Sequence, residues 1–445
     1  MSSSPDTATA PERIGKYRVI RRLGEGATSE VFLCMDEFND REVAVKRVRA
    51  AAMRDAQDGH VFARFFASEA ALAGLLHHPN VVEIYDAVPD PEAPYVVMEY
   101  VPGSTLRPYC DPGRLLPLEQ IVELGFKCAM ALGYCFEHGL VHRDVKPANL
   151  LAVERNGSIT DVKISDFGSV LNLGSDATQV HRVGSLAYMS PEQLDGGELD
   201  CRADIYSLGA VLFHMIAGRP PFEGGSQASL MHKVCHAEPA SLTGLRQGTT
   251  TALDEVVQRA LAKRSTDRYP NWEAFGQALS GLIAHQQVPR GGMQGVLDSE
   301  RFTLLRSLEF FSQFGDVQLW EVVHRAKWQR FPVGHALYKR GEEGRTFHII
   351  AAGGVEVIRD GAVVAQLGAG TSVGEMAYLA PSPELRQHST DVLVTTTATT
   401  ISFTPDTLDH LSQHSRHLFD EAFIRVLVRR LHAAHEAMAH PRRIL

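Results

Sequence analysis

The spacing of apolar residues predicts a strand-rich start and a helical middle for this chain. Short runs of alternating apolar and polar residues are bounded by glycine, asparagine and aspartate, a pattern typical of β-strands. The expected strands are residues 17–23, 30–35, 42–48, 81–85 and 95–100, with a helix at 61–76. Helical spacing then covers residues 118–138, 204–218, 252–262 and 272–284. We therefore expect an α+β domain over residues 15–285, with a small β-rich lobe followed by a larger helical lobe.

The pattern changes after residue 285. Residues 286–300 are rich in glycine and polar side chains, which is typical of a linker. A helix is expected at 302–325, and the Val, Ile, Thr and turn-like glycines of 346–403 fit a compact β-roll or barrel. Within that stretch Asp360-Gly361 predicts a tight hairpin. Residues 301–445 are thus expected to form a second domain, a β-roll with flanking helices.

The two ends of the chain carry different patterns. The Ser/Thr/Pro/Ala-rich residues 1–14 are expected to be a disordered tail. Near the other end, Thr404-Pro405 is typical of a helix start. In the helix that follows, Phe423, Leu427 and Leu431 recur at four-residue spacing, and we interpret them as a lid packed on the roll. A stripe that forms a homodimer is the alternative. Three arginines are interpreted as a solvated face: Arg425, Arg429 and Arg430.

Composition narrows the class of protein. The 445 residues are 44% hydrophobic and 22% charged, as in soluble globular proteins of two or three domains. The net charge of −9 argues against a protein that binds nucleic acid through an overall positive charge. Any site for an anion must therefore be a local pocket. Six cysteines without CxxC spacing argue against zinc and disulfide scaffolds. With no membrane-span-like run and no signal-peptide pattern, a cytoplasmic protein is expected.

Two motifs in the strand-rich lobe could hold phosphates. The first places Gly24 and Gly26 between strands, where backbone N–H groups can approach phosphates without a Cβ in the way. An ordinary glycine hairpin is the alternative for this motif taken alone. The second motif ends a strand at Lys46, a spacing that fits a lysine pairing with ATP phosphates. Such a lysine needs a carboxylate from a nearby helix, and Glu69 is the candidate.

The most informative motif is His142-Arg143-Asp144-Val145-Lys146-Pro147-Ala148-Asn149, followed by Asp166-Phe167-Gly168. Asp144 can accept the proton of an attacking hydroxyl, and Lys146 can neutralise a transferring phosphoryl group. Asn149 and Asp166 supply the hard oxygen ligands that Mg²⁺ prefers. This combination indicates phosphoryl transfer.

With these motifs the chain resembles the eukaryotic-type Ser/Thr protein kinase family over about residues 17–284. The resemblance implies a bilobal fold, ATP and Mg²⁺ as ligands, and protein substrates. It makes Lys46, Glu69, Asp144 and Lys146 the catalytic candidates. The implied ATP contacts are Leu23, Gly24, Glu25, Gly26, Val31, Ala44, Lys46, Met98, Glu99 and Val101. A scaffold or pseudokinase that binds partners without phosphoryl transfer is the alternative reading.

The resemblance also implies regulation and support of the site. Arg143 beside Asp144 suggests control by activation-loop phosphorylation, because a guanidinium can pair with phosphate. The phosphorylation candidates are Thr178, Ser175 and Ser185. Asp204 resembles a buried aspartate that supports the catalytic loop. Arg268 resembles the ion-pair partner of Glu192.

The C-terminal part resembles the cyclic-nucleotide-binding domain family over about residues 304–435. In that reading Glu375 accepts hydrogen bonds from a ribose hydroxyl and Arg386 holds a phosphate. The candidate contacts are Gly374, Glu375, Met376, Ala377, Arg386 and Ser389. The match is partial, because no proline precedes Arg386 and Asp391 adds negative charge nearby. Cyclic AMP and cyclic GMP both stay open as ligands, and a roll used for docking or dimerisation without nucleotide is the alternative.

Overall fold

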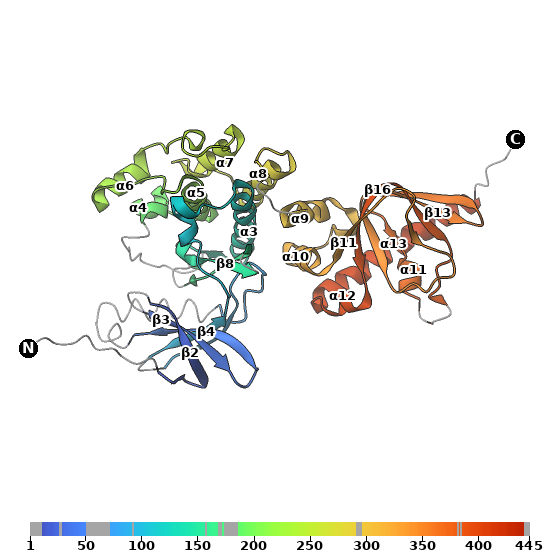
Figure 1. The fold of residues 1–445 in the computed structure, drawn as a ribbon, viewed down its shortest axis with the longest axis horizontal. Coiled ribbons are helices and arrows are strands. Elements are labelled where there is room, and N and C mark those ends of the chain that lie inside the picture. Colours follow the sequence, from blue (N-terminus) through green and yellow to red (C-terminus); the bar gives the residue numbers. More distant parts are fainter. Residues whose placement is uncertain are drawn as a thin grey trace, which may run out of the picture. The chain divides into compact units, whose positions relative to one another are not determined.

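The computed structural model describes residues 11–25, 29–49, 72–90, 93–155, 158–167, 171–172, 186–290, 296–380, 382 and 385–439. The chain divides into two compact units, Met1–Gly295 and Val296–Leu445 (Figure 1). The division falls within residues 286–300, where the sequence predicts a linker. Across the described ranges no helix has both the length and the apolar character needed to cross a membrane.

The first unit opens with an antiparallel sheet of six strands in the order β1-β2-β3-β4-β6-β5. The strands are β1 (Arg13–Ile14), β2 (Tyr17–Glu25), β3 (Ser29–Asp36), β4 (Arg41–Val48), β5 (Ile84–Val88) and β6 (Tyr95–Glu99). Phe32, Val43 and Val45 are buried in its core. Alternating apolar residues thus place one sheet face inward, as the sequence predicts.

One strand prediction in this lobe is confirmed only at its last two residues. Residues 81–85 were expected to form a strand, but Val81 makes only an isolated bridge to Ile164, and β5 begins at Ile84. The backbone there bonds to the other lobe instead, since Val82 N donates to Ile164 O at 2.9 Å. Most of the helix expected at 61–76 lies outside the described residues. Residues 72–75 form a turn.

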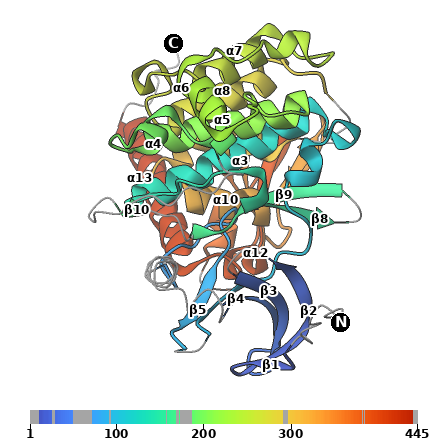
Figure 2. The ribbon, with the colours of Figure 1, turned by 90° about the vertical axis from the view of Figure 1, so that its left-hand side faces the viewer.

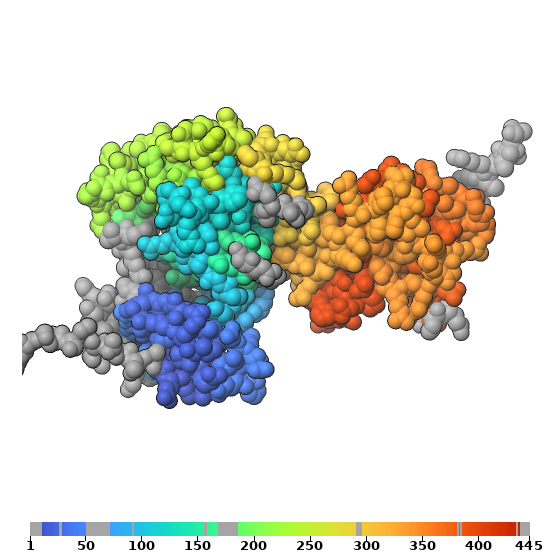
Figure 3. Space-filling model, viewed as in Figure 1, coloured from blue at the N-terminus to red at the C-terminus, as the bar shows by residue number. Residues whose placement is uncertain are grey.

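The second lobe of this unit is mainly helical, and Figure 2 shows helices α3, α5 and α8 stacked above the sheet. The helices are α3 (Leu118–Glu137), α4 (Pro191–Asp195), α5 (Cys201–Ala217), α6 (Gln227–His236), α7 (Thr251–Ala260) and α8 (Trp272–Ala284). The short strands of this lobe all lie between α3 and α4 along the chain: β7 (Leu140–Val141), β8 (Leu150–Arg155), β9 (Ser158–Ile164) and β10 (Leu171–Asn172). In Figure 3 the blue strand-rich lobe and the cyan-to-green helical lobe are distinct masses.

Helix α5 lies at the centre of the helical lobe. It begins at Asp200, whose side chain accepts a hydrogen bond from Arg202 N, and it ends at Gly218, which takes φ +73°. Nearly all of its side chains are buried, as in a helix surrounded by protein on every side. The expected helix at 204–218 is therefore confirmed, with an earlier start set by the Asp200 cap.

Both described ends of the predicted linker are packed. Thr250 Oγ1 donates to Gln287 O at 2.6 Å, and Val288 is buried in the first unit. Leu297 and Ser299 are buried in the second unit. Residues 291–295 lie outside the described part of the chain.

The second unit is built on a sheet in the order β11-β16-β13-β14, with β12 paired to β16 and β15 paired to β13. Its strands are β11 (Lys327–Phe331), β12 (Ala336–Tyr338), β13 (Phe347–Arg359), β14 (Ala362–Gly368), β15 (Ser372–Val373) and β16 (Asp391–Phe403). Arg359 pairs with Ala362, and the residues between them, Asp360 and Gly361, take φ of +52° and +80°. Positive φ at both turn positions defines a type I′ hairpin, so the hairpin prediction is confirmed.

The helices of the second unit are α9 (Asp298–Ser307), α10 (Asp316–Arg325), α11 (Glu375–Tyr378), α12 (Pro405–Asp409) and α13 (Gln413–Ala439). The helical character expected at 302–325 is confirmed, but it is divided between α9 and α10, because Leu308 is extended and the chain turns so that Phe310 and Phe311 enter the core. The predicted cap at Thr404 is confirmed, since its side chain accepts from Thr407 N. That helix is short, and α13 begins anew at Gln413.

An aromatic cluster joins α13 to the roll. The ring centroids of Phe347 and Phe403 lie 4.9 Å apart, and Phe419 and Phe423 of α13 each lie 4.9 Å from one of those rings. The lid prediction is right for Phe423, which is buried. It is wrong for its two helical neighbours, Leu427 and Leu431, which are 37% and 56% exposed.

Candidate active site and nucleotide site

A buried carboxylate of α5 holds the loop that carries Asp144. Asp204 is 2% exposed, and its two oxygens accept hydrogen bonds from His142 N at 2.6 Å and Arg143 N at 2.8 Å. Arg143 takes φ +66°, a left-handed conformation that costs energy in a residue with a Cβ. The two bonds to Asp204 hold the loop in this strained shape, so its geometry is fixed before any substrate arrives.

Asp144 lies between two polar partners from the same loop. Its Oδ2 accepts from Lys146 Nζ at 2.6 Å and from Asn149 Nδ2 at 3.0 Å. Asn149 Nδ2 also donates to Asp144 O at 2.8 Å. The structure therefore brings together three residues that the sequence placed in one motif, with a carboxylate that can accept a proton next to a cation.

Lys46 and Asp166 meet across the two lobes of the first unit. Lys46 Nζ lies 2.7 Å from Asp166 Oδ1, although the residues are 120 positions apart. The positive charge of Lys46 holds the pKa of Asp166 well below its usual range, so this carboxylate is ionised at neutral pH. Asp166 takes φ +67°, and the Phe167 ring packs 5.0 Å from the ring of His142. Glu69, the expected partner of Lys46, lies outside the described residues.

The positions of Asn149 and Asp166 fit a magnesium site. Ser165 N, next to Asp166, donates to Asn149 O at 2.9 Å, which ties the two segments together. The amide nitrogen of Asn149 is engaged with Asp144, so its carbonyl oxygen is the atom suited to a cation. In the part of the chain that the structure describes, no group of three or more His, Cys, Asp or Glu side chains is arranged to hold a metal ion.

Most of the expected ATP contacts lie on neighbouring strands of the sheet, and Val101 follows the end of β6. Ala44 of β4 pairs with Met98 of β6, and Gly24 and Glu25 lie at the end of β2. The side chain of Glu99 is not available to an adenine, because its Oε2 accepts from Lys163 Nζ at 2.8 Å. Only the backbone of Glu99 can serve there. Gly26 and the phosphorylation candidates Thr178, Ser175 and Ser185 lie outside the described residues.

The predicted supporting pair is present. Arg268 donates from Nη1 and Nη2 to the two oxygens of Glu192 at 2.6 and 2.8 Å. The Arg268 side chain is fully buried. This bidentate ion pair holds α4, which carries Glu192, against the segment before α8, which carries Arg268.

In the second unit, the predicted nucleotide contacts surround the start of α11. Gly374 takes φ +85°, and a Cβ at this position would lie 2.4 Å from the hydroxyl of Tyr338, so only glycine fits. Glu375 and Ala377 are buried, whereas Met376 is 65% exposed. Arg386 is half-buried and its Nε donates to Ala380 O at 3.4 Å, while Ser389 is exposed. The fold thus places Gly374 and Glu375 at the start of α11. Arg386 contacts the carbonyl oxygen of Ala380, which follows the same helix.

A residue that the sequence analysis assigned to solvent contacts this site. Arg430 of α13 donates from Nη1 to Glu375 Oε1 and from Nη2 to Ser372 O, the latter at 2.7 Å. Glu375 is 1% exposed, and burial raises its pKa while Arg430 opposes that rise. The interpretation of Arg430 as part of a solvated face is wrong. Helical spacing alone gave no signal for this contact, because Glu375 is 55 positions away.

Comparison with known proteins agrees with this geometry. The model of the protein kinase domain matches residues 17–283, and the model of the cyclic nucleotide-binding domain matches residues 328–415. The serine/threonine-protein kinase PknB of Mycobacterium leprae is 35% identical over 308 residues, 67% of this chain and 48% of that protein. The serine/threonine-protein kinase PrkC of Bacillus subtilis is 36% identical over 261 residues, 58% of this chain and 39% of that protein.

The chain spans about half the length of the PknB proteins it matches, and less of PrkC. The two matched regions correspond to the two compact units of the structure. Since the kinase model matches more than half of the chain, this chain belongs to the protein kinase family and carries a cyclic nucleotide-binding domain after its kinase domain.

Proposed function

We propose that this chain is a serine/threonine protein kinase that transfers the γ-phosphoryl group of ATP to hydroxyls of proteins. The observation that carries the proposal is the arrangement of Asp144, whose carboxylate lies 2.6 Å from Lys146 Nζ and 3.0 Å from Asn149 Nδ2. The loop that holds it is fixed through the buried Asp204. A carboxylate fixed beside a cation is suited to orient a hydroxyl and accept its proton.

The proposed step is an in-line displacement. The substrate hydroxyl oxygen attacks the γ-phosphorus, the bond from that phosphorus to the bridging oxygen of ADP breaks, and Asp144 accepts the hydroxyl proton. Lys146 stabilises the negative charge on the transferring group. Lys46 reaches to within 2.7 Å of Asp166, so it can engage phosphates held beside that carboxylate. Mg²⁺ held by Asn149 and Asp166 would neutralise phosphate charge.

The competing function is that of a scaffold without phosphoryl transfer. Radiolabelled ATP with Mg²⁺ and a generic protein substrate separates the two functions. The full chain should label the substrate and the Asp144→Asn variant should not. Equal labelling by both proteins would show that Asp144 is not the base. No labelling by the wild-type chain, tested with several substrates, would favour the scaffold.

Autophosphorylation is part of the proposal. Arg143, next to the proposed base, supports it because a guanidinium can pair with a phosphate on the activation segment. Mass spectrometry of the wild-type chain should find phosphate on Thr178, Ser175 or Ser185, and the Asp144→Asn variant should lack it. Phosphate on the Asp144→Asn variant prepared without other kinases would contradict this.

We propose further that the second unit is a sensor for cyclic AMP or cyclic GMP that regulates the kinase. The buried Glu375 and Arg386, whose Nε donates to Ala380 O just after α11, support this, since they offer an acceptor for ribose hydroxyls and a cation for a phosphate. Because Arg430 contacts Glu375, a nucleotide whose ribose uses that carboxylate would compete with Arg430 for it. Regulation requires that the ligand bind two states of the protein with different affinity.

Calorimetric titration with each nucleotide and turnover with and without it test this sensor function. Tight binding with unchanged turnover would contradict regulation. If neither nucleotide binds, the roll serves docking or dimerisation instead.

A further inference from the structure

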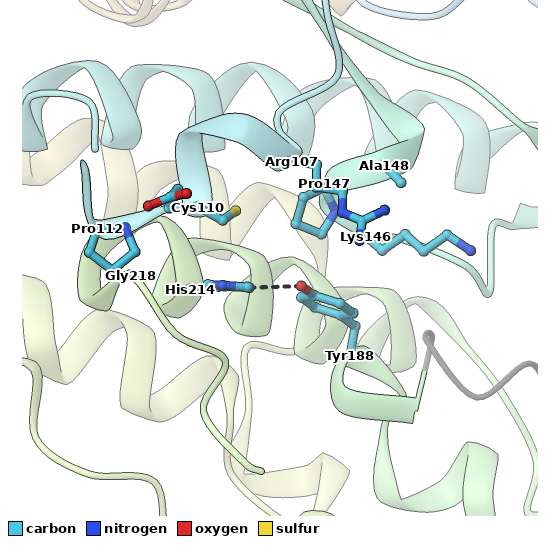
Figure 4. Close-up of a pocket in the computed structure, with 10 residues that line it drawn as sticks. Arg107, Cys110, Pro112, Lys146, Pro147, Ala148, Tyr188, His214 and Gly218 are labelled. Atoms are coloured by element: carbon cyan, nitrogen blue, oxygen red, sulfur yellow. Dashed lines mark hydrogen bonds between the residues drawn. The ribbon is translucent and has the colours of Figure 1, made fainter. Parts of the chain in front are cut away.

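The two residues proposed for Mg²⁺ flank the open end of one hairpin. The loop that carries Asp144 leads through Ala148 (Figure 4) to Asn149, and β8 begins at the next residue. Its antiparallel partner β9 ends two residues before Asp166, and the first residue of β8 pairs with the last residue of β9. A contact that holds this hairpin therefore also holds Asn149 and Asp166 in position relative to each other.

The carboxylate of Asp161, on β9, joins three segments of the first unit. Its Oδ1 accepts hydrogen bonds from Val162 N at 2.9 Å and from Asn80 Nδ2 at 2.7 Å. Lys127 of α3 approaches the same oxygen, with its Nζ 3.2 Å away. Both α3 and the segment before β5 thus reach the hairpin through this one side chain.

Lys127 is a charged residue in the interior of the helical lobe. It is 1% exposed, and its Nζ also donates to Thr160 O at 3.5 Å. A buried ammonium group has lost its hydration, which a nearby carboxylate must offset. Apolar side chains of similar size often stabilise a protein as well as a buried ion pair does, or better. Stability alone therefore does not account for a lysine here, whereas its contact with β9 points to a role in geometry.

The segment before β5 holds the same strand from its other side. Asn80 is fully buried, its Nδ2 donates to Val162 O at 2.8 Å, and its O accepts from Ile164 N at 2.8 Å. These bonds fix β9 up to its last residue, two positions before Asp166. The orientation of Asp161, which Lys127 and Asn80 share, is thus passed along the strand to the metal candidate.

We propose that Lys127 is a positioning residue for the metal site, holding the hairpin through Asp161 so that Asn149 and Asp166 can bind one Mg²⁺ together. This inference rests on the proposed kinase function. Mg²⁺ demands near-ideal octahedral geometry, so a small shift of one ligand relative to another weakens binding. Residues that orient metal ligands from outside the first layer of contacts have large effects on metal affinity for this reason.

The dependence of turnover on Mg²⁺ tests the proposal. Lys127→Met keeps an unbranched apolar side chain and removes the ammonium group. At a fixed, saturating ATP concentration, the free Mg²⁺ concentration for half-maximal turnover should rise about tenfold. KM for a peptide substrate should change by about twofold or less, and added Mg²⁺ should restore most of kcat. An unchanged Mg²⁺ requirement in Lys127→Met overturns the proposal.

A double variant separates positioning from folding. Lys127→Met alone leaves the carboxylate of Asp161 without its cation, which lowers stability. Adding Asp161→Asn removes the second charge and keeps an oxygen that Asn80 can bond, so the urea midpoint should return close to the wild-type value. A positioning role predicts that the raised Mg²⁺ requirement persists in this folded double variant. Recovery of both stability and the wild-type Mg²⁺ requirement would show that the pair is only structural and would contradict the proposal.

Asp254→Asn is the matched control. Asp254 is a buried carboxylate of α7, and its Oδ1 accepts from Leu242 N at 3.0 Å, so its bond lies outside the hairpin. The variant should lower the urea midpoint and leave the Mg²⁺ requirement at the wild-type value. A raised Mg²⁺ requirement in this control as well would mean that any loss of stability has that effect, and the proposal would fail.

Metal binding can also be measured without turnover. Mn²⁺ takes the same kinds of oxygen ligands as Mg²⁺, and electron paramagnetic resonance distinguishes free from bound Mn²⁺. With an ATP analogue that cannot be hydrolysed, Lys127→Met should bind Mn²⁺ about tenfold more weakly than the wild-type chain. That result, together with no phosphorylation by the wild-type chain, would support the positioning role and contradict the kinase function. Equal Mn²⁺ affinity of the two proteins would contradict the positioning role alone.

Discussion

The two proposed ligand sites of this molecule are assembled in different ways. In the first unit, Asp144, Lys146 and Asn149 belong to one loop and bond to one another within five positions of sequence. In the second unit, Glu375 contacts Arg430, which lies 55 positions away on the last helix. A site made within one loop is present whenever that loop is formed. A site closed by a distant helix depends on where that helix lies.

This difference has a physical consequence for regulation. The loop around Asp144 is fixed by bonds to the buried Asp204, so ligand binding has little left to rearrange there. Glu375 already has a cationic partner, so a nucleotide must replace one charge-assisted hydrogen bond by another. The first arrangement suits catalysis, which gains from groups positioned in advance. The second suits a sensor, because binding there changes the contacts of α13.

The largest expected effect is on the catalytic loop. Asp144→Asn keeps the side-chain shape but removes the proton acceptor, so turnover should fall by about 10³-fold, within the range known for general bases. Steady-state kinetics with a peptide substrate measures it, and cyclic nucleotide binding to the second unit should not change. Asp195→Asn, an exposed carboxylate of the same lobe, is the control. A loss below tenfold would show that the loop does not act through this carboxylate.

The second prediction concerns the support of that loop. In Asp204→Asn one of the two buried N–H groups, of His142 or Arg143, loses its acceptor, which should lower the free energy of unfolding by about 1–3 kcal/mol. Urea unfolding of the full chain, followed with a probe in the first unit, measures the change. If stability and turnover both stay at wild-type values, Asp204 of α5 does not hold the catalytic loop in place. The catalytic site would then be no more rigidly positioned than the site around Glu375.

The third prediction concerns Arg430. Arg430→Ala removes the group that competes for Glu375, so the affinity for the cyclic nucleotide that binds should rise by about tenfold, which corresponds to losing one charge-assisted bond. Arg429→Ala is the matched control, because Arg429 pairs with Glu309 in an exposed ion pair of little energetic value. Weaker binding in Arg430→Ala would mean that Arg430 helps to hold the ligand, and the two sites would then be less different.

The smallest effect is on pH dependence, where the two units should respond in opposite directions. Burial raises the pKa of Glu375, so the folded second unit binds a proton more readily than the unfolded chain, and its stability falls as pH rises above the usual glutamate range near 4.5. Lys46 lowers the pKa of Asp166, so that contribution is present above the usual aspartate range near 3.8 and is lost as pH falls below it.

Urea unfolding from pH 3 to 8 tests both directions. Subtracting the curve of Glu375→Gln from that of the wild type should leave a difference that becomes less favourable with rising pH. The same subtraction with Asp166→Asn should leave one that becomes less favourable as pH falls. If both differences in unfolding free energy changed in the same direction with pH, one of the two pKa shifts would have the opposite direction to the one stated here.

The sequence predicted the first site more fully than the second, because the residues of the first site lie close together in the chain. Residues 142–149 and 166 sit in short motifs whose chemistry can be read without knowing the fold, and the hairpin at Asp360-Gly361 was predictable because type I′ turns need those residues. Arg430 could not be predicted, since the path of α13 over the roll depends on where Phe419 and Phe423 pack. The break at Leu308 likewise follows from burial of Phe310 and Phe311, which periodicity does not reveal.

Helix α5 joins two parts of the helical lobe. Its first turn carries Asp204, which supports the catalytic loop, and its last turn carries His214, whose Nδ1 lies 2.7 Å from Tyr188 Oη. Ten residues at 1.5 Å each separate them by about 15 Å along a buried helix. Substitutions near His214 can therefore alter the surroundings of Tyr188 while the hydrogen bonds of Asp204 to the catalytic loop stay intact.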